Sequence, residues 1–290
     1  MTNQRRRDPQ NSDRLRRRYD KDITKRFKAI AKGITKIVDR EDYFGIKPRD
    51  TPQRQLAALF TNQQWANLTD VEKVEAFRAW LKDQIDRGLL QEEAAWQTEY
   101  LKSSHVAGLQ STVKTDLSAG VLDQAANFAV SQPLESAKLL YTRAFHALEG
   151  ITQHMDTQLS RILTEGFVKG EHAHKVARTM VKEIENITKR RAIVMARTEL
   201  ARVYAEAQLD GFQRDGQINV KLFAEWSSAG DDRVCPKCQP MDGRIMTIAE
   251  ARGLIPFHPL CRCAWIPRGQ KKLSKRRLAK ASPAVREAQQ

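Results

Sequence analysis

The four cysteines of this chain all fall within one segment of fewer than thirty residues. They occur as Cys235-Pro-Lys-Cys238 and as Cys261-Arg-Cys263, and His258 lies three residues before the second pair. A C-x-x-C turn aims two thiolates at one ion, and tetrahedral zinc takes thiolate and imidazole ligands. The segment therefore predicts a zinc site within a small folded module.

Five candidate ligands compete for the four positions of a tetrahedral ion. The preferred set is the four cysteines, and His258 is the alternative to either Cys261 or Cys263. A site in which protein ligands fill every position leaves no place for water, so a structural role is favoured over a catalytic one. The other reading is four reduced cysteines packed as small apolar side chains, or a disulfide formed after release from the cell.

The first residues of the chain are basic but lack the apolar segment of a secretory signal. No apolar run is long enough to span a bilayer. We therefore expect the protein to be made in a reducing cytoplasm, where clustered cysteines favour metal over disulfides.

The formal net charge of +15 is concentrated at the two ends of the sequence. Residues 1–40 hold 14 Lys and Arg against 5 Asp and Glu, residues 266–290 hold 8 against 1, and residues 41–265 are nearly neutral. Basic arms on a neutral body bind nucleic acid non-specifically or meet an acidic protein surface, although they can also be merely solvated. The arm residues expected to make such contacts are Arg5, Arg6, Arg7, Arg16, Arg17, Arg18, Lys271, Lys272, Lys275, Arg276 and Arg277.

Helical periodicity dominates the chain up to residue 215. Apolar residues recur every three or four positions from Leu15 to Ile37, which predicts an amphipathic helix beginning near Asp13. Thr69 and Glu72 have the spacing of a capping box at the start of a second helix, with Val71 expected to face inward. Basic residues on the opposite face of the first helix are Arg16, Arg17, Lys21, Lys25, Lys28, Lys32 and Lys36.

The period changes to two after residue 216. Leu222, Ala224 and Trp226 alternate with other residues as in a strand, Asp242-Gly243 predicts a two-residue hairpin, and residues 264–266 could form a closing strand. The predicted class is α+β: a mainly helical body followed by a small zinc-stapled β module, with basic N- and C-terminal arms. The expected divisions are a basic arm and amphipathic helix (1–45), the helical body (53–215), the zinc-binding β module (216–268) and a basic disordered tail (269–290).

The motifs taken together resemble the Mu F-type phage head morphogenesis family of minor capsid proteins. The matching features are Arg197-Thr198-Glu199 on a long helix, a strand with a tryptophan, Asp232 to Cys238, Asp242-Gly243 and His258-Pro-x-Cys-Arg-Cys263. The resemblance covers roughly residues 90–268 and is sharpest at residues 190–267.

The resemblance implies a minor head protein of a tailed phage that acts in capsid assembly at the portal vertex. It further implies a place in the virion, the portal protein and other head proteins as partners, and non-specific contact with packaged DNA or an effect on DNA ejection. Arg197, Thr198 and Glu199 are expected to form a structural polar network that joins the helix to the zinc module.

We expect no enzymatic activity, because the sequence lacks the known phosphate-binding, hydrolase and metalloprotease motifs. One alternative is a zinc-containing His-Asn-His-type nuclease, for which this chain offers only His258. The other is a general nucleic-acid-binding protein.

Overall fold

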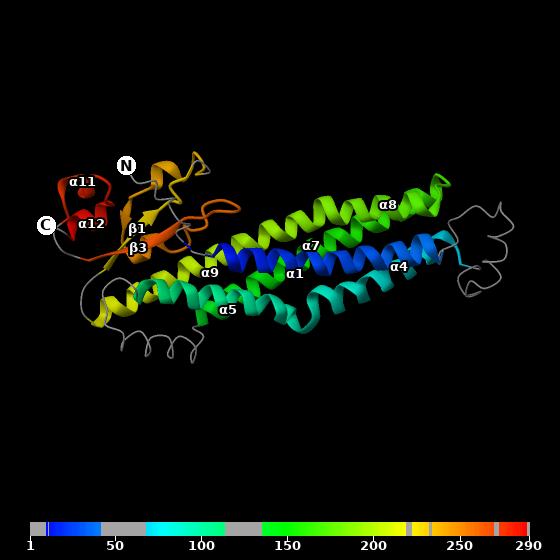
Figure 1. Cartoon of the computed structure of the whole chain (residues 1–290), viewed down its shortest axis with the longest axis horizontal. Helices are drawn as coiled ribbons and strands as arrows, with labels where there is room; N and C mark the ends of the chain where they lie inside the picture. The colour runs from blue at the N-terminus through cyan, green and yellow to red at the C-terminus, as the bar shows by residue number, and fades with distance from the viewer. Residues whose placement is uncertain are drawn as a thin grey trace. The chain divides into compact units, whose positions relative to one another are not determined.

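The computed structural model describes residues 10, 12–41, 68–113, 135–218, 222–231, 234–269 and 273–288 (Figure 1). Most of these residues are helical, and three strands form one antiparallel sheet, so the α+β class is confirmed. The long helices are α1 (Asp13–Ile34), α4 (Asp70–Ile85), α5 (Gln91–Val113), α7 (Glu135–Val168), α8 (Ala173–Glu183) and α9 (Lys189–Ile218). Wider π-helical turns follow α1, α4 and α8, at η1 (Thr35–Arg40), η2 (Asp86–Leu90) and η3 (Ile184–Thr188).

The chain forms two compact units, each assembled from separate stretches of sequence. One unit contains the described residues of 1–19, 96–144 and 194–290, and the other contains those of 20–95 and 145–193. The second unit is helical throughout the part that the structure describes. No helix of the described residues is both long and apolar enough to cross a membrane.

The predicted apolar stripe of α1 is confirmed by the burial of its side chains. Tyr19, Ile23, Phe27, Ile30 and Ile34 are all nearly inaccessible to solvent. Beyond Ile34 the helix widens into η1, and the buried position passes to Val38 while Ile37 is half-buried. The wider turn shifts the register of the helix, and the sequence pattern alone did not show this shift.

The capping box at the start of α4 is also confirmed. The Thr69 hydroxyl accepts from the Glu72 N–H, and the Glu72 carboxylate accepts from the Thr69 N–H at 2.7 Å. The inward placement of Val71 was wrong, because this side chain is 68% exposed. Position 71 lies in the first turn of α4, and the buried face of that helix begins only at Phe77.

Small residues let α5 and α9 cross closely in the first unit. A Cβ atom on Gly108 would lie 2.5 Å from the Tyr204 carbonyl oxygen, and one on Gly211 would lie 2.6 Å from the Thr112 hydroxyl oxygen. The Ser104 hydroxyl donates to the Leu200 carbonyl at 2.8 Å in the same contact. The α9 helix is therefore held against α5 along the turns that also carry the β module.

Replacing Gly108 with alanine is expected to lower the free energy of unfolding by about 1–3 kcal/mol, because the added methyl overpacks this crossing. Chemical denaturation followed by circular dichroism measures the change. The control is Gly150→Ala in α7, where no described atom lies within 4 Å of the new methyl. Removing a helical glycine there should stabilise the protein by about 0.5–1 kcal/mol. Equal effects of the two substitutions would contradict the close crossing.

The sheet has the strand order β2-β1-β3, with β1 (Leu222–Ser227) between β2 (Ile245–Met246) and β3 (Ala264–Gly269). Trp226 of β1 is the register partner of Trp265 of β3. The outer edge of β3 is tied to α9 by one side chain, since Gln208 donates to the Trp265 carbonyl at 3.0 Å and accepts from the Trp265 N–H at 2.9 Å. This pairing satisfies backbone groups that an edge strand would otherwise leave open.

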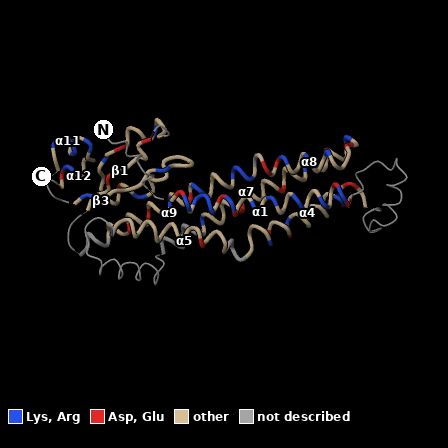
Figure 2. Tube along the Cα trace, in the orientation of Figure 1, with Lys and Arg blue, Asp and Glu red and all other residues tan. Residues whose placement is uncertain are grey.

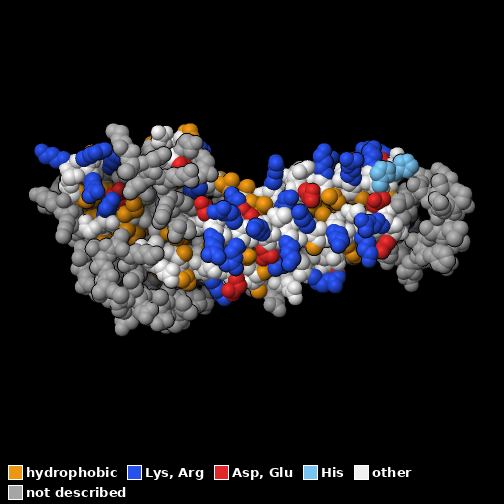
Figure 3. All heavy atoms as spheres, in the orientation of Figure 1, with side chains coloured by type: hydrophobic (Ala, Val, Ile, Leu, Met, Phe, Trp, Pro, Cys, Tyr) orange, Lys and Arg blue, Asp and Glu red, His pale blue; other side chains and the backbone are white. Residues whose placement is uncertain are grey.

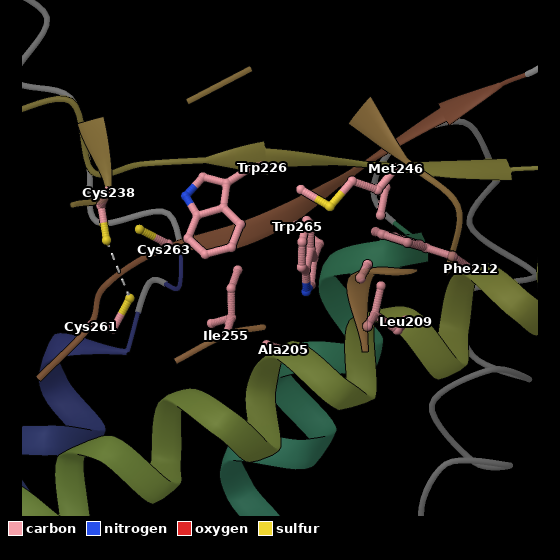
Figure 4. Close-up of a cluster of buried hydrophobic side chains, with 12 residues drawn as sticks. Ala205, Leu209, Phe212, Trp226, Cys238, Met246, Ile255, Cys261, Cys263 and Trp265 are labelled. Carbon is pink, nitrogen blue, oxygen red and sulfur yellow. Dashed lines mark hydrogen bonds between the residues drawn. The ribbon is translucent and has the colours of Figure 1, made fainter. Parts of the chain in front are cut away.

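Both faces of the sheet are covered. One face packs against α9 through Ala205, Leu209 and Phe212, and the same cluster includes Trp226, Trp265 and three of the cysteines (Figure 4). On the other face Phe223 and Ile245 pack against Leu273, Ala281 and Val285. The helices α11 (Lys275–Leu278) and α12 (Pro283–Glu287) carry this second layer beside the strands (Figure 1).

The expected disordered tail is therefore wrong for residues 273–288. Ile245 donates its N–H to the Lys280 carbonyl at 3.1 Å and accepts from the Ser282 N–H at 2.8 Å, so the tail covers the free edge of β2. The basic composition of this segment concealed three apolar side chains that are buried against the sheet.

The prediction of a two-residue hairpin at Asp242-Gly243 was also wrong. The connection between β1 and β2 spans residues 228–244, and Asp242-Gly243 forms a turn only at its end. Gly243 adopts a φ of +76°, which favours glycine, and its N–H donates to the Trp226 carbonyl at 2.8 Å. The long connection is what carries the first cysteine pair.

Candidate metal centre

Cys235 and Cys238 lie in the connection between β1 and β2, on a tight turn. The N–H groups of Cys238 and Gln239 both donate to the Cys235 carbonyl, at 3.0 and 3.1 Å. The Cys238 N–H also lies 3.3 Å from the Cys235 sulfur, where it stabilises negative charge on that atom. The local fold thus holds both sulfurs at one place, as the C-x-x-C spacing predicted.

His258, Cys261 and Cys263 lie on the loop that leads into β3. The Nδ1 atom of His258 is 2.7 Å from the Pro259 carbonyl oxygen. Its Nε2 atom is 3.1 Å from the Cys235 sulfur and 3.2 Å from the Cys238 sulfur. With the proton on Nδ1, the Nε2 lone pair faces the two sulfurs, which is the orientation that a metal ligand requires.

The five donor residues form two overlapping groups that share Cys238. One is Cys235, Cys238 and His258, the other is Cys238, Cys261 and Cys263, and within each group the donor atoms lie within 4.8 Å of one another. Bonds of about 2.3 Å to a tetrahedral ion would place two sulfurs roughly 3.8 Å apart. The sulfurs of Cys238 and Cys261 are 3.9 Å apart, so the spacing and the chemistry of these donors fit a thiolate-binding ion.

The close packing of the sulfurs governs their ionisation. Burial raises the pKa of the Cys238 thiol to about 12, and the neighbouring Cys261 adds to this effect. A hydrogen bond with Cys261, together with burial, raises the pKa of Cys263. A hydrogen bond from Cys263 lowers the pKa of Cys261 to about 5, against the opposing effect of burial. The cluster thus favours one thiolate by itself, and a divalent cation would compensate further negative charge.

An ion pair ties the two ligand-bearing loops together. Arg262 lies between the second pair of cysteines, and its guanidinium donates to both carboxylate oxygens of Asp231, at 2.7 and 2.6 Å. Asp231 precedes the first pair of cysteines in the connection from β1. Sequence reasoning missed this pair. The sequence features that could have indicated it are the arginine between Cys261 and Cys263 and the acidic residues just before Cys235.

The Arg197-Thr198-Glu199 segment lies on α9, and its members have different surroundings. The Thr198 hydroxyl donates to the Val194 carbonyl at 2.6 Å and accepts from the Leu260 N–H at 3.1 Å. Leu260 has a φ of +62°, so this contact supports an unusual backbone conformation next to Cys261. Thr198 therefore joins the helix to the ligand-bearing loop.

Glu199 is buried and faces two cations outside that loop. Its carboxylate oxygens lie 3.8 Å from Arg143 Nε and 3.3 Å from Arg202 Nε. A carboxylate that is 7% exposed needs such partners, because an unpaired buried charge is costly. Arg197 also has an interaction partner.

The residues predicted for the basic arms are distributed unevenly. Arg17 and Arg18 on α1 and Lys275, Arg276 and Arg277 on α11 are exposed. Arg16 was wrongly placed on a solvent face, since it is buried and donates to the Gln10 side chain. Gln10 in turn donates to the Cys263 carbonyl at 2.7 Å. Arg5, Arg6, Arg7, Lys271 and Lys272 lie outside the described residues.

A row of exposed lysines lies along α1 and η1 within the helical unit. Its members are Lys21, Lys25, Lys28, Lys32 and Lys36. Among the described residues, the first four form no ion pair, and Lys36 lies 3.4 Å from Glu41. Figure 2 marks the basic positions along the traces of α1 and α8, and Figure 3 shows basic side chains over the same helical region. The α8 helix contacts η1.

Residues 157–266 of the chain match the family model described as Phage Mu protein F like protein. The matched stretch contains all five candidate ligands as well as Arg197, Thr198 and Glu199. Neither the comparison with curated proteins nor the comparison with solved structures found a match. The match confirms the predicted resemblance over these residues.

Proposed function

We propose that this chain, a member of the Mu F-type phage head morphogenesis family through residues 157–266, is a minor head protein that is built into the capsid at the portal vertex. The family match is the observation that carries the proposal, because head morphogenesis implies association with other head proteins and with the virion. The portal vertex follows from the resemblance between this chain and minor capsid proteins of tailed phages. In this proposal the chain acts by binding and not by catalysis.

The proposed role of the cysteine cluster is to hold one zinc ion as a structural staple. Four of the five donors would bind the ion, and Cys238 is the one donor that belongs to both groups. Bound zinc neutralises the thiolates and cross-links the two loops. The Cys238–Cys261 distance and the Nε2 orientation of His258 support this assignment.

The geometry around His258 supports a non-enzymatic role over the nuclease alternative. A general base needs a ring nitrogen that is free to take a proton from a water or a substrate. Here Nδ1 faces the Pro259 carbonyl, and Nε2 faces the sulfurs of Cys235 and Cys238. Both ring nitrogens therefore already have partners within the module.

The lysine row of α1 is the surface that we propose contacts packaged DNA. Lys21 to Lys36 extend over about 22 Å of helix at 1.5 Å per residue, which is long enough to face several phosphates of a duplex. Arg178 and Lys182 on α8 are further exposed cations in the same unit. Such contacts are non-specific in sequence and strongly dependent on salt.

Co-purification with the portal protein tests the proposed docking. The tagged chain should retain the portal protein after washes at high salt. Salt screens the attraction between exposed charges, and docking through the folded body does not depend on that attraction. Loss of the portal at high salt would assign docking to the basic residues instead. If no portal protein co-purifies at any salt concentration, the portal-vertex proposal is overturned.

Nicking of plasmid DNA with added magnesium or manganese, lost in His258→Ala, would favour the nuclease.

A further inference from the structure

Two buried tryptophans of the β module have indole N–H groups without a hydrogen-bond acceptor among the described residues. Trp226 is fully buried and Trp265 is 2% exposed, and neither Nε1 atom has a partner. A buried donor without an acceptor is unfavourable, and such groups are rare in folded proteins. Each of the two therefore requires an explanation.

The two indoles point in different directions (Figure 4). The nitrogen-bearing edge of Trp226 faces the sulfur atoms of Cys238 and Cys263, whereas the nitrogen of Trp265 lies at the lower end of its ring in this view, on the side of α9. Both rings belong to the same buried cluster as these cysteines. The Trp226 ring is held in place by edge-to-face contacts with Trp265, at 5.3 Å between centroids, and with Phe257, at 5.7 Å.

We propose that, in the metal-bound protein, the Trp226 indole N–H donates a hydrogen bond to a metal-bound thiolate on the Cys238–Cys263 side of the cluster. The proposal rests on the zinc site proposed above. The indole can only donate, and a thiolate is a charged acceptor, so each group supplies what the other lacks. By withdrawing charge from the sulfur, the bond protects the ligand from protonation and retains the metal. Trp226 is a positioning residue in this account, not a ligand.

The test compares Trp226→Phe with Trp265→Phe in the full-length chain. Both substitutions remove a buried indole from the same cluster, but only the first removes a donor that faces the sulfurs. Competition with a chromophoric chelator measures zinc affinity, and circular dichroism checks the fold. We expect Trp226→Phe to weaken zinc binding by about 10- to 100-fold, as loss of a ligand's hydrogen-bond partner does. Trp265→Phe should retain the wild-type affinity.

A second measurement on the unmutated chain keeps the proposal testable if Trp226→Phe does not fold. The protein is loaded with an NMR-active cadmium isotope, and its tryptophans are labelled with an NMR-active nitrogen. Scalar coupling between cadmium and the Trp226 indole proton is expected, because coupling through a hydrogen bond requires that bond. Trp265 should show none.

The possible failures are distinguishable. A wild-type chain that binds no metal would overturn the proposed zinc site itself. Bound metal with equal affinity in both variants, or with no coupling at Trp226, would overturn only the hydrogen bond.

Discussion

Replacing Cys238 with serine is expected to abolish stoichiometric zinc binding and to unfold the β module. Cys238 is the donor shared by both groups of potential ligands, so its loss leaves no three donors of the described residues within 4.8 Å of one another. A structural zinc contributes about 10–16 kcal/mol to a small domain, which exceeds the roughly 5–15 kcal/mol by which typical proteins are stable. The three-stranded sheet includes a β2 of only two residues and cannot replace that contribution by its own hydrogen bonds.

The unfolding should be local to the module. Trp226 and Trp265 should become exposed, and this shifts their fluorescence to longer wavelengths, while most of the far-ultraviolet helical signal remains. A strong chelator should produce the same change in the wild-type chain, and added zinc should reverse it there but not in Cys238→Ser. A Cys238→Ser chain with wild-type zinc content and fluorescence would contradict the proposed structural zinc site.

Single variants of the other donors should identify the fifth, dispensable one. A tetrahedral ion uses four donors, so one variant among His258→Ala, Cys261→Ser and Cys263→Ser should keep a full equivalent of zinc. Our preferred set of four cysteines predicts that this variant is His258→Ala. Retention of zinc by Cys263→Ser would instead show that His258 is a ligand.

Neutralising Lys25, Lys28 and Lys32 to glutamine is expected to weaken binding to duplex DNA by about a hundredfold or more at low salt. Each phosphate contact contributes about 0.9 to the slope of log affinity against log salt concentration. Loss of three contacts should therefore reduce the magnitude of that slope by about 2.7. Fluorescence anisotropy with a labelled duplex, repeated over a salt series, measures both quantities.

The matched control neutralises Lys82, Lys102 and Lys169. It removes the same total charge, but each of these lysines is already paired with a carboxylate, at 2.5 Å from Asp86, 3.4 Å from Glu99 and 3.0 Å from Glu165. Its slope should remain close to that of the wild type. If both triple variants lose the same affinity, the attraction comes from net charge and not from the row on α1.

The features that could be predicted from the sequence are those fixed by local chemistry. The capping box at Thr69, the stripe of α1 and the turn at Cys235 and Cys238 each depend on spacings of a few residues, and the structure shows them as predicted. The family match over residues 157–266 agrees with the order of motifs that carried the resemblance.

The features that were missed depend on contacts between distant segments. The tail that was predicted to be disordered packs on the sheet through Leu273, Ala281 and Val285. These side chains are buried against Phe223 of β1 and Ile245 of β2. Arg16 is buried and donates to Gln10, which in turn donates to the Cys263 carbonyl. Each of the two units combines segments that are far apart in the sequence, whereas the predicted domains are continuous stretches of the chain. The predicted domain boundaries stay a prediction.

The composition of purified phage heads tests the proposed function most directly. Heads are isolated from cells that produce the encoding phage, washed at high salt, and analysed by quantitative mass spectrometry. The account predicts that the chain is present in the heads at a fixed, low ratio to the portal protein. Absence of the chain from the washed heads, while it is abundant in the same lysate, would contradict its role as a head protein.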